Sequence, residues 1–291
     1  MNKEALAELV AQILETMGQP AEKKAETLPV KEPSQASGEM IPDITEIDLR
    51  KLYQTKDPAD PQGFLRLKER TPARLGSGRA GPRYTTLTQL RFRADHAAAR
   101  DAVFSQVPED YAEQQGFVPV VTQCKDKDQY LTRPDLGRRF DEENGAKIRK
   151  AIPTPPRVQL VVGDGLSSAA ILANAADCLA AIRSALQTQG IRTGTTLFVR
   201  YCRVGAGDAI GDLTGCELVC MLVGERPGLV TDKSMSAYIT YKPHTGIPES
   251  CRTVVSNIHA QGTPAVEAGA FIGELIGKIL EKKVSGVGLQ L

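Results

Sequence analysis

The chain has 291 residues, which is room for about two domains, and its 41% hydrophobic and 24% charged residues suit a packed core with a polar surface. A formal net charge of +1 argues against nucleic-acid or membrane binding through bulk charge. No apolar run approaches the roughly 20 residues needed to span a bilayer.

The first predicted element is an amphipathic helix within residues 1–18. Its apolar residues recur at helical spacing along one stripe: Leu6, Leu9, Val10, Ile13, Leu14 and Met17. Acidic residues interrupt this stretch, so it lacks the continuous apolar region of a secretory signal. Residues 19–43 are rich in Pro, Glu, Lys, Ala and Ser, which predicts a flexible linker. Because a helix of about 15 residues is marginally stable alone, we expect it to dock on a partner or on its own protein.

Residues 44–152 are predicted to form a mainly helical domain, with long helices over residues 84–107 and 136–152. A basic cluster lies between residues 64 and 93 and consists of Arg66, Lys68, Arg70, Arg74, Arg79, Arg83, Arg91 and Arg93. It is either a surface for an anionic partner or a solvated or subunit-facing side of the domain. Aromatic residues are too sparse there to stack on bases, so we expect no nucleic-acid partner.

Residues 153–291 alternate between strand and helix patterns. A buried strand begins at Val158 and ends at Gly163, and Ser167 or Ser168 can cap the helix that follows, which extends to residue 189. Further strands are predicted over residues 196–201, 218–223 and 237–241. The last helix is predicted to begin at Pro264, with Thr263 as its N-cap. This pattern is typical of an α/β fold: a Rossmann-like, doubly wound, mostly parallel sheet.

Three glycine-rich loops follow predicted strands, at residues 163–168, 203–208 and 224–228. The carboxyl ends of parallel strands share one edge of a sheet, so these loops predict a ligand site there. A dinucleotide is disfavoured because Ser168 replaces the third glycine of the fingerprint and Asp164 would face the pyrophosphate. No GxxxxGK or GxSxG motif is present.

We predict no catalytic residue and no metal site in this chain. Its six cysteines include no CxxC pair and no histidine at metal-site spacing, and we expect them to be reduced thiols in a cytosolic protein. The histidines, His96, His244 and His259, lack a nucleophile and a carboxylate at diagnostic spacing. Glu225, between Gly224 and Arg226, either accepts hydrogen bonds from a ligand or pairs with Arg226 or Arg203.

Six stretches together resemble the small subunit of ethanolamine ammonia-lyase, an adenosylcobalamin-dependent enzyme family. They are GRAGPR (78–83), YLTRPDLGRR (130–139), DGLS (164–167), FVRYCRV (198–204), LVGERPGL (222–229) and SNIHAQGTPAVEA (256–268). The resemblance implies a large subunit as partner, which holds the substrate and most catalytic groups. Together the two subunits would convert ethanolamine to acetaldehyde and ammonia by radical chemistry.

The resemblance also implies which residues contact the cobalamin. The valine of RYxRV is Val204 and the glutamate of GERPG is Glu225. The third contact falls at Val254, where some relatives carry cysteine, and Arg203 is a weaker candidate through its adjacency to Val204.

The terminal helix resembles targeting helices of enzymes in ethanolamine-using microcompartments. We therefore expect a cytoplasmic protein inside a bacterial microcompartment, with residues 1–18 contacting shell or cargo. Two alternatives stay open, a scaffold or adaptor subunit of a microcompartment enzyme and a stand-alone nucleotide-binding enzyme on a Rossmann-like domain.

Overall fold

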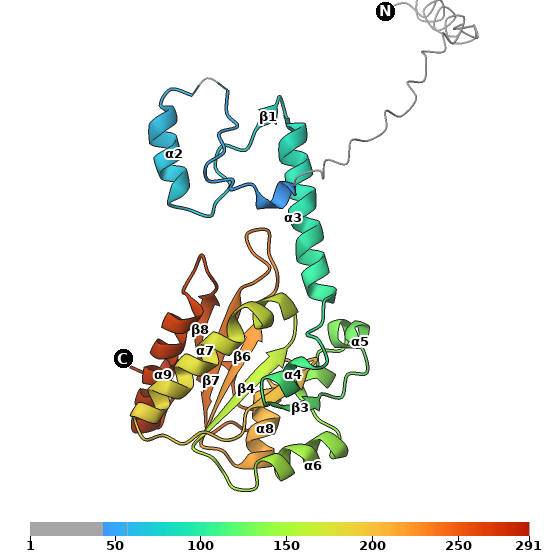
Figure 1. Ribbon diagram of the computed structural model, residues 1–291, viewed down its shortest axis with the longest axis vertical. Helices are drawn as coiled ribbons and strands as arrows, with labels where there is room; N and C mark the ends of the chain where they lie inside the picture. The colour runs from blue at the N-terminus through green and yellow to red at the C-terminus, as the bar shows by residue number, and fades with distance from the viewer. Residues whose placement is uncertain (1–42, 57, 291) are drawn as a thin grey trace, which may run out of the picture. The chain divides into compact units, whose positions relative to one another are not determined.

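The computed structural model describes residues 43–56 and 58–290 (Figure 1). The predicted helix of residues 1–18 and all of the predicted linker except Asp43 lie outside the described residues. Residues 44–291 group as one compact unit.

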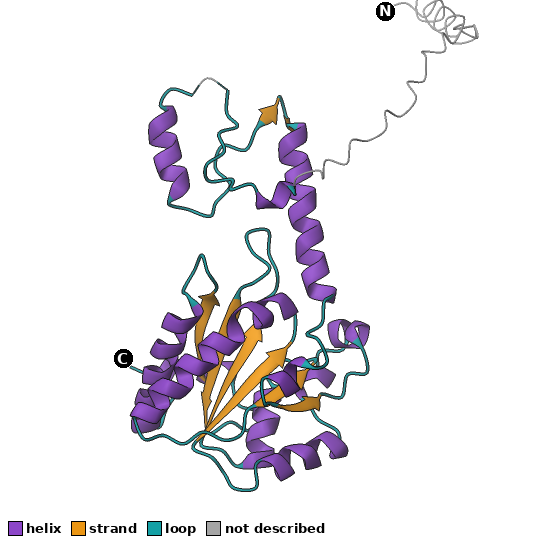
Figure 2. Ribbon diagram, viewed as in Figure 1, coloured by secondary structure: helices purple, strands orange, loops and turns teal. Residues whose placement is uncertain are grey.

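The described elements are short connecting turns, helices and strands (Figure 2). The helices are α2 (Pro61–Glu69), α3 (Thr86–Phe104), α4 (Tyr111–Gln114), α5 (Lys127–Thr132), α6 (Glu142–Ala151), α7 (Ser168–Thr188), α8 (Ala206–Thr214) and α9 (Ala265–Lys282). The strands are β1 (Arg79–Ala80), β2 (Arg83–Tyr84), β3 (Val118–Val121), β4 (Val158–Asp164), β5 (Leu197–Arg200), β6 (Leu218–Gly224), β7 (Met235–Tyr241) and β8 (Arg252–Ile258). Short 3-10 turns are η1 (Ile44–Glu46), η2 (Leu136–Arg138), η3 (Glu249–Cys251) and η4 (Gly286–Gly288).

Six strands form one mixed sheet in the order β3-β5-β4-β6-β7-β8. The first four strands in this order run parallel, whereas β7 pairs antiparallel with β6 and β8 antiparallel with β7. Every residue of β4 and β6 is buried, because helices cover both faces of the centre of the sheet. The prediction of an α/β fold with a mostly parallel sheet is confirmed.

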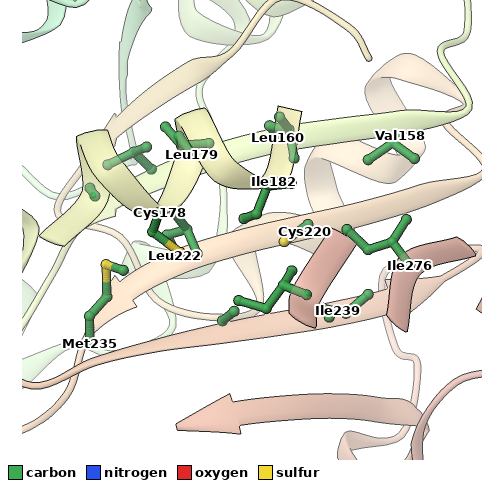
Figure 3. Packing of buried hydrophobic residues seen from close by; sticks show 14 of the residues in the cluster. Val158, Leu160, Cys178, Leu179, Ile182, Cys220, Leu222, Met235, Ile239 and Ile276 are labelled. Atoms are coloured by element: carbon green, nitrogen blue, oxygen red, sulfur yellow. The ribbon is translucent and has the colours of Figure 1, made fainter. Parts of the chain in front are cut away.

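Helices α7 and α9 cover one face of the sheet and α6 and α8 the other. Figure 3 shows Leu179 and Ile182 of α7 among side chains of the strands, with Ile276 of α9 in the same cluster. The Ser167 hydroxyl accepts from the Ala170 N–H at 3.1 Å, which confirms the predicted cap of α7. Burial of these apolar side chains is the main source of the stability of the fold.

Glycines let α7 and α9 approach closely. A Cβ on Gly269 would lie 2.4 Å from the Cys178 carbonyl oxygen, and one on Gly273 would lie 2.4 Å from the Ala185 Cβ. By length and composition α7 is the one described helix that could cross a membrane. Its buried residues belong to the core that it shares with the sheet and α9, so we interpret it as a core helix.

The structure departs from the sequence predictions at several elements. Strand β3 belongs to the segment predicted to be mainly helical, and β8 was not predicted. The single helix predicted over residues 136–152 is the turn η2 followed by α6, because Asp141 caps a new helix by accepting from the Asn144 N–H at 2.8 Å. In α9 the N-cap is Pro264 rather than Thr263.

Candidate functional site

A cavity of about 270 Å³ lies where β4, β5 and β6 end. The chain passes from β4 to β5 on one side and then crosses to β6 on the other side of β4. Its two crossover helices, α7 and α8, cover opposite faces of the sheet. Such a switch point in strand order is where open α/β sheets bind ligands. Three of the four predicted site residues, Arg203, Val204 and Glu225, line this cavity.

Arg203 is held against Tyr130. The Arg203 backbone N–H donates to the Gly137 carbonyl at 2.9 Å, and Nη2 donates to the Tyr130 carbonyl at 2.8 Å. The guanidinium carbon lies 4.2 Å from the centroid of the Tyr130 ring, a cation–π contact. The Arg203 Nε is buried and finds no hydrogen-bond partner in the described part of the chain. Arg203 therefore contributes to the cavity wall a positive charge that is held in place and a hydrogen-bond donor that is not used within the described residues.

Tyr130 is a buried residue of the cavity wall that sequence reasoning did not select. Its hydroxyl donates to the Cys202 carbonyl at 3.1 Å, and burial raises its pKa, so the phenol stays neutral. The Lys127 Nζ lies 5.3 Å from the Tyr130 ring centroid and donates to the Gly165 carbonyl at 2.7 Å. Burial lowers the pKa of Lys127. These contacts fix the first glycine-rich loop against α5.

Val204 follows β5 and is half-buried against the core on the α6 and α8 side. Between β5 and Val204, Tyr201 adopts a φ of 57°, which is uncommon for a residue with a side chain. The Tyr201 carbonyl accepts from Thr122 Oγ1 at 3.0 Å, and the Cys202 N–H donates to the Asp164 carbonyl at 2.8 Å. The backbone turn that presents Val204 is thus held from both neighbouring strands.

Glu225 is half-buried at the end of β6, and its carboxylate is bound within the chain. Oε1 accepts from Ser236 Oγ at 2.7 Å and from the Asn257 backbone N–H at 2.8 Å. Burial alone would raise the pKa of Glu225, but hydrogen bonds and nearby charge, of which the bonds from Ser236 and Asn257 are the largest contributions, together lower the pKa. Among the described residues Glu225 forms no ion pair with Arg203 or Arg226. The ion-pair interpretation of Glu225 is therefore wrong.

Asn257 marks an irregularity in β8 that the Glu225 carboxylate supports. The pairing of β7 with β8 shifts register between Met235 and Ala237, and Asn257 has a φ of 63°. Asn257 Oδ1 also lies 2.8 Å from the His259 Nε2. Glu225 therefore connects the cavity to the SNIH segment.

Val254 does not line the cavity. It pairs with Tyr238 across β7 and β8, and paired residues point to the same face of a sheet. Tyr238 does line the cavity, so Val254 lies beside it, with 45% of its surface exposed. The cofactor contact assigned to Val254 stays a prediction.

Asp164 is buried and hydrogen-bonded within the chain, and does not face the cavity. It is 2% exposed and accepts from Ser168 Oγ at 2.6 Å and from the Val107 N–H at 3.1 Å. Arg200 lies 4.0 Å from its Oδ2. Asp164 thus fastens the segment after α3 to the end of β4.

Part of the predicted basic cluster forms ion pairs and hydrogen bonds within the chain. Arg74 and Arg91 both pair with Asp95, at 2.6 and 2.9 Å. Arg91 Nη1 also donates to the carbonyls of Ile44 and Ile47, each at 2.7 Å. A second cavity of about 500 Å³ beside these residues contains none of the predicted site residues.

Within the described ranges, no group of three or more His, Cys, Asp or Glu residues is placed to hold a metal ion. His259 is buried and bonded to Asn257, His244 bonds the Lys242 carbonyl, and His96 is exposed on α3. The described residues around the cavity offer fixed donors and acceptors around an apolar patch. Ser236 and Tyr238 were missed because the alternation of β7 predicted a strand but not which face meets the cavity.

Comparison with known proteins identifies relatives over the whole site. Residues 61–290 match the family model for the ethanolamine ammonia-lyase light chain. The ethanolamine ammonia-lyase small subunits of Clostridium perfringens and Clostridioides difficile are 54% and 53% identical to this chain, each over all of both chains. That of Listeria monocytogenes is 58% identical over 86% of this chain and 85% of its own length.

Proposed function

Because the chain belongs to the family of ethanolamine ammonia-lyase light chains, we propose that it acts with a large subunit to convert ethanolamine to acetaldehyde and ammonia. In this proposal the chain supplies one wall of an adenosylcobalamin site. The observation that carries it is that Arg203, Val204 and Glu225, from two loops, meet at one cavity at the switch point of the sheet.

The residues around the cavity fit the edge of a corrin ring. Its peripheral amides need both hydrogen-bond donors and acceptors, and Arg203 offers the former and Glu225 the latter. Val204 and Leu166 offer apolar surface for ring methyl groups. A cavity of about 270 Å³ is far too small for a whole cobalamin, so this chain would hold one edge of the cofactor and the partner the rest.

The part of this chain in the reaction is binding and orientation. Adenosylcobalamin, when bound, supplies radical chemistry by cleavage of its cobalt–carbon bond. The Tyr130 stack holds the Arg203 guanidinium still, and Ser236 and Asn257 hold the Glu225 carboxylate still. Groups already fixed in this way bind a ligand without a further loss of side-chain entropy. We assign the substrate and the catalytic groups to the large subunit.

We also propose that residues 1–18 direct the complex into a bacterial microcompartment in the cytoplasm. The support is the sequence stripe from Leu6 to Met17, which is followed by a linker composition.

Reconstitution tests the proposed function. The purified chain and a purified large subunit are assayed separately and together for ammonia release from ethanolamine with adenosylcobalamin. We expect release only from the mixture. Turnover by this chain alone would favour a stand-alone enzyme, and full turnover by the large subunit alone would favour a scaffold or adaptor; either result would refute the proposal.

A further inference from the structure

Helix α3 leaves one of its faces uncovered. Its buried residues, Thr88, Asp95 and Ala102, lie on the opposite face. The uncovered stripe follows helical spacing along the whole helix and consists of Leu87, Leu90, Arg93, Ala97, Arg100 and Phe104. Leu87, Leu90 and Phe104 are 42%, 51% and 47% exposed. Helices in folded proteins gain most of their stability by burying an apolar face, and the described residues leave this stripe exposed.

A small hairpin stands at the start of α3. Strands β1 and β2 pair antiparallel, and all four of their residues are exposed. The Arg79 guanidinium lies 4.5 Å from the Tyr84 ring centroid, and Tyr84 packs edge-on against Phe92 of α3 at 5.1 Å between centroids. These ring contacts hold the hairpin, and with it Arg79, against the start of α3.

The hairpin and the stripe carry a surplus of positive charge. Arg79, Arg83, Arg93 and Arg100 are exposed, and none forms an ion pair with a described residue. The acidic residue among the exposed positions of α3 is Asp101, near its end. Two copies of this surface would repel each other, whereas an acidic surface would be attracted.

Hydrogen bonds and a ring contact connect the end of the stripe with the cavity. Directly after Phe104, the Ser105 carbonyl accepts from Lys127 Nζ at 3.2 Å and shares the hydrogen of the Ser168 hydroxyl, at 2.9 Å, with the Asp164 carboxylate. Lys127 lies over the ring of Tyr130, which lines the cavity. A 19-residue helix is about 28 Å long, so a strip about 10 Å wide along it covers about 280 Å². That area is smaller than the roughly 800 Å² that each partner buries in a stable complex. A stable complex formed through the stripe would therefore need further surface, and the contacts of Lys127 connect the end of α3 to the edge of the cavity.

From these observations we infer that the uncovered face of α3 and the β1–β2 hairpin form a contact surface for the large subunit, which meets it with an acidic patch set among apolar side chains. This inference rests on the proposed function, because the partner that covers the cavity is the large subunit. It gives Arg79, Arg83 and Arg93 of the basic cluster a task in subunit recognition.

The test measures the affinity of full-length variants for the purified large subunit. The charge variant is Arg93→Glu with Arg100→Glu, and the apolar variant is Leu87→Gln with Leu90→Gln, since glutamine is a good helix former. Arg192→Glu, in an exposed loop at the amino-terminal edge of the sheet, is the charge control, and Phe271→Gln on α9 is the apolar control. Circular dichroism establishes that each variant is folded.

We expect each α3 variant to weaken the complex at least tenfold while both controls bind like the parent. Raising the salt concentration should weaken the parent complex more than the charge variant, because exposed charges are screened. Parent-like affinity of both α3 variants would overturn the surface and leave the proposed function standing, whereas a parent chain that does not bind the large subunit would refute the proposed function. A third outcome would show instead that the face joins two copies of this chain. In that case the parent chain alone is a dimer, the apolar variant alone is a monomer, and both bind the large subunit equally well.

Discussion

Two substitutions of Glu225 separate the charge of its carboxylate from its hydrogen bonds. Glu225→Gln keeps a carbonyl oxygen that can accept from Ser236 and Asn257, as Oε1 does at 2.7 and 2.8 Å. Glu225→Ala removes both hydrogen bonds and leaves the Asn257 N–H at the register shift of β8 without its acceptor. The part of the cavity wall formed by β7 and β8 then loses the hydrogen bonds that hold it to the end of β6.

The size of each effect follows from these contacts. Hydrogen bonds to a charged group contribute about 1.5–3 kcal/mol each. Because Glu225 is only half-buried, water replaces part of what is lost. We expect Glu225→Ala to weaken adenosylcobalamin binding by about 2–3 kcal/mol, a factor of about 30–150 in Kd. Glu225→Gln should cost about 1 kcal/mol, a factor of about 5.

The assay is a titration of the assembled two-subunit enzyme with adenosylcobalamin, which gives the Kd of the cofactor and the kcat at saturation. We expect Kd to rise in the order parent, Glu225→Gln, Glu225→Ala, with kcat changing less than twofold. Glu217→Gln, at the opposite end of β6, is the matched control. If Glu225→Ala binds the cofactor as tightly as the parent, the role assigned to Glu225 is wrong.

The lowered pKa of Glu225 adds a pH dependence to the same prediction. A carboxyl whose pKa is lower in the folded chain than its ordinary value of 4.5 contributes stability above that value. This stability is lost as the pH falls through the folded pKa. The protection factor of the Asn257 N–H, which is its intrinsic exchange rate divided by its observed rate at the same pH, should therefore fall as the pH drops below 4.5 in the parent. Glu225→Gln should remove this fall in protection; the same pH dependence of the protection factor in parent and variant would contradict the assignment.

Three further predictions concern the rest of the chain. Arg252→Met should lower the free energy of unfolding by about 3–5 kcal/mol in urea titrations, because it strands the buried Asp208 carboxylate that Arg252 now binds at 2.7 and 2.8 Å; a loss under 1 kcal/mol would contradict this. Gly273→Ala should lower the free energy of unfolding by about 1–3 kcal/mol, because it forces α7 and α9 apart. The control Gly228→Ala, which has open space around it, should change this free energy by less than about 0.5 kcal/mol. Equal melting temperatures of the two variants would refute the packing argument. Deleting residues 1–18 should leave turnover with the large subunit unchanged and abolish encapsulation in cells that form the compartment, and normal packaging would defeat the targeting proposal.

The sequence predicted elements best where local chemistry and burial agree. The buried run of β4 and the Ser167 cap of α7 each have a short-range cause, and both are present. The break predicted at Gly163 is wrong, because β4 continues through Gly163 to Asp164. The same holds for β5, β6, β7 and the long helix α3. Local patterns do not encode which strands pair, so they could not reveal that β3 lies at the edge of the sheet beside β5.

The candidate site was predictable only in part for the same reason. Loops after parallel strands share an edge, so Arg203, Val204 and Glu225 could be grouped from sequence. Tyr130 enters from α5, and its role depends on the stack with Arg203, which no spacing in the sequence reveals. The sequence predicts a ligand or an arginine as the partner of the Glu225 carboxylate. The hydrogen bond that it also accepts from the Asn257 backbone, 32 residues away, could not be predicted from local spacing.

The most direct test of the central claim is an electron-density map of this chain assembled with its large subunit and adenosylcobalamin. Our account predicts that an edge of the corrin ring lies against Val204 and Glu225 while the reactive face of the cofactor points into the large subunit. Corrin density that is enclosed by the large subunit alone, away from the ends of β5 and β6, would contradict it.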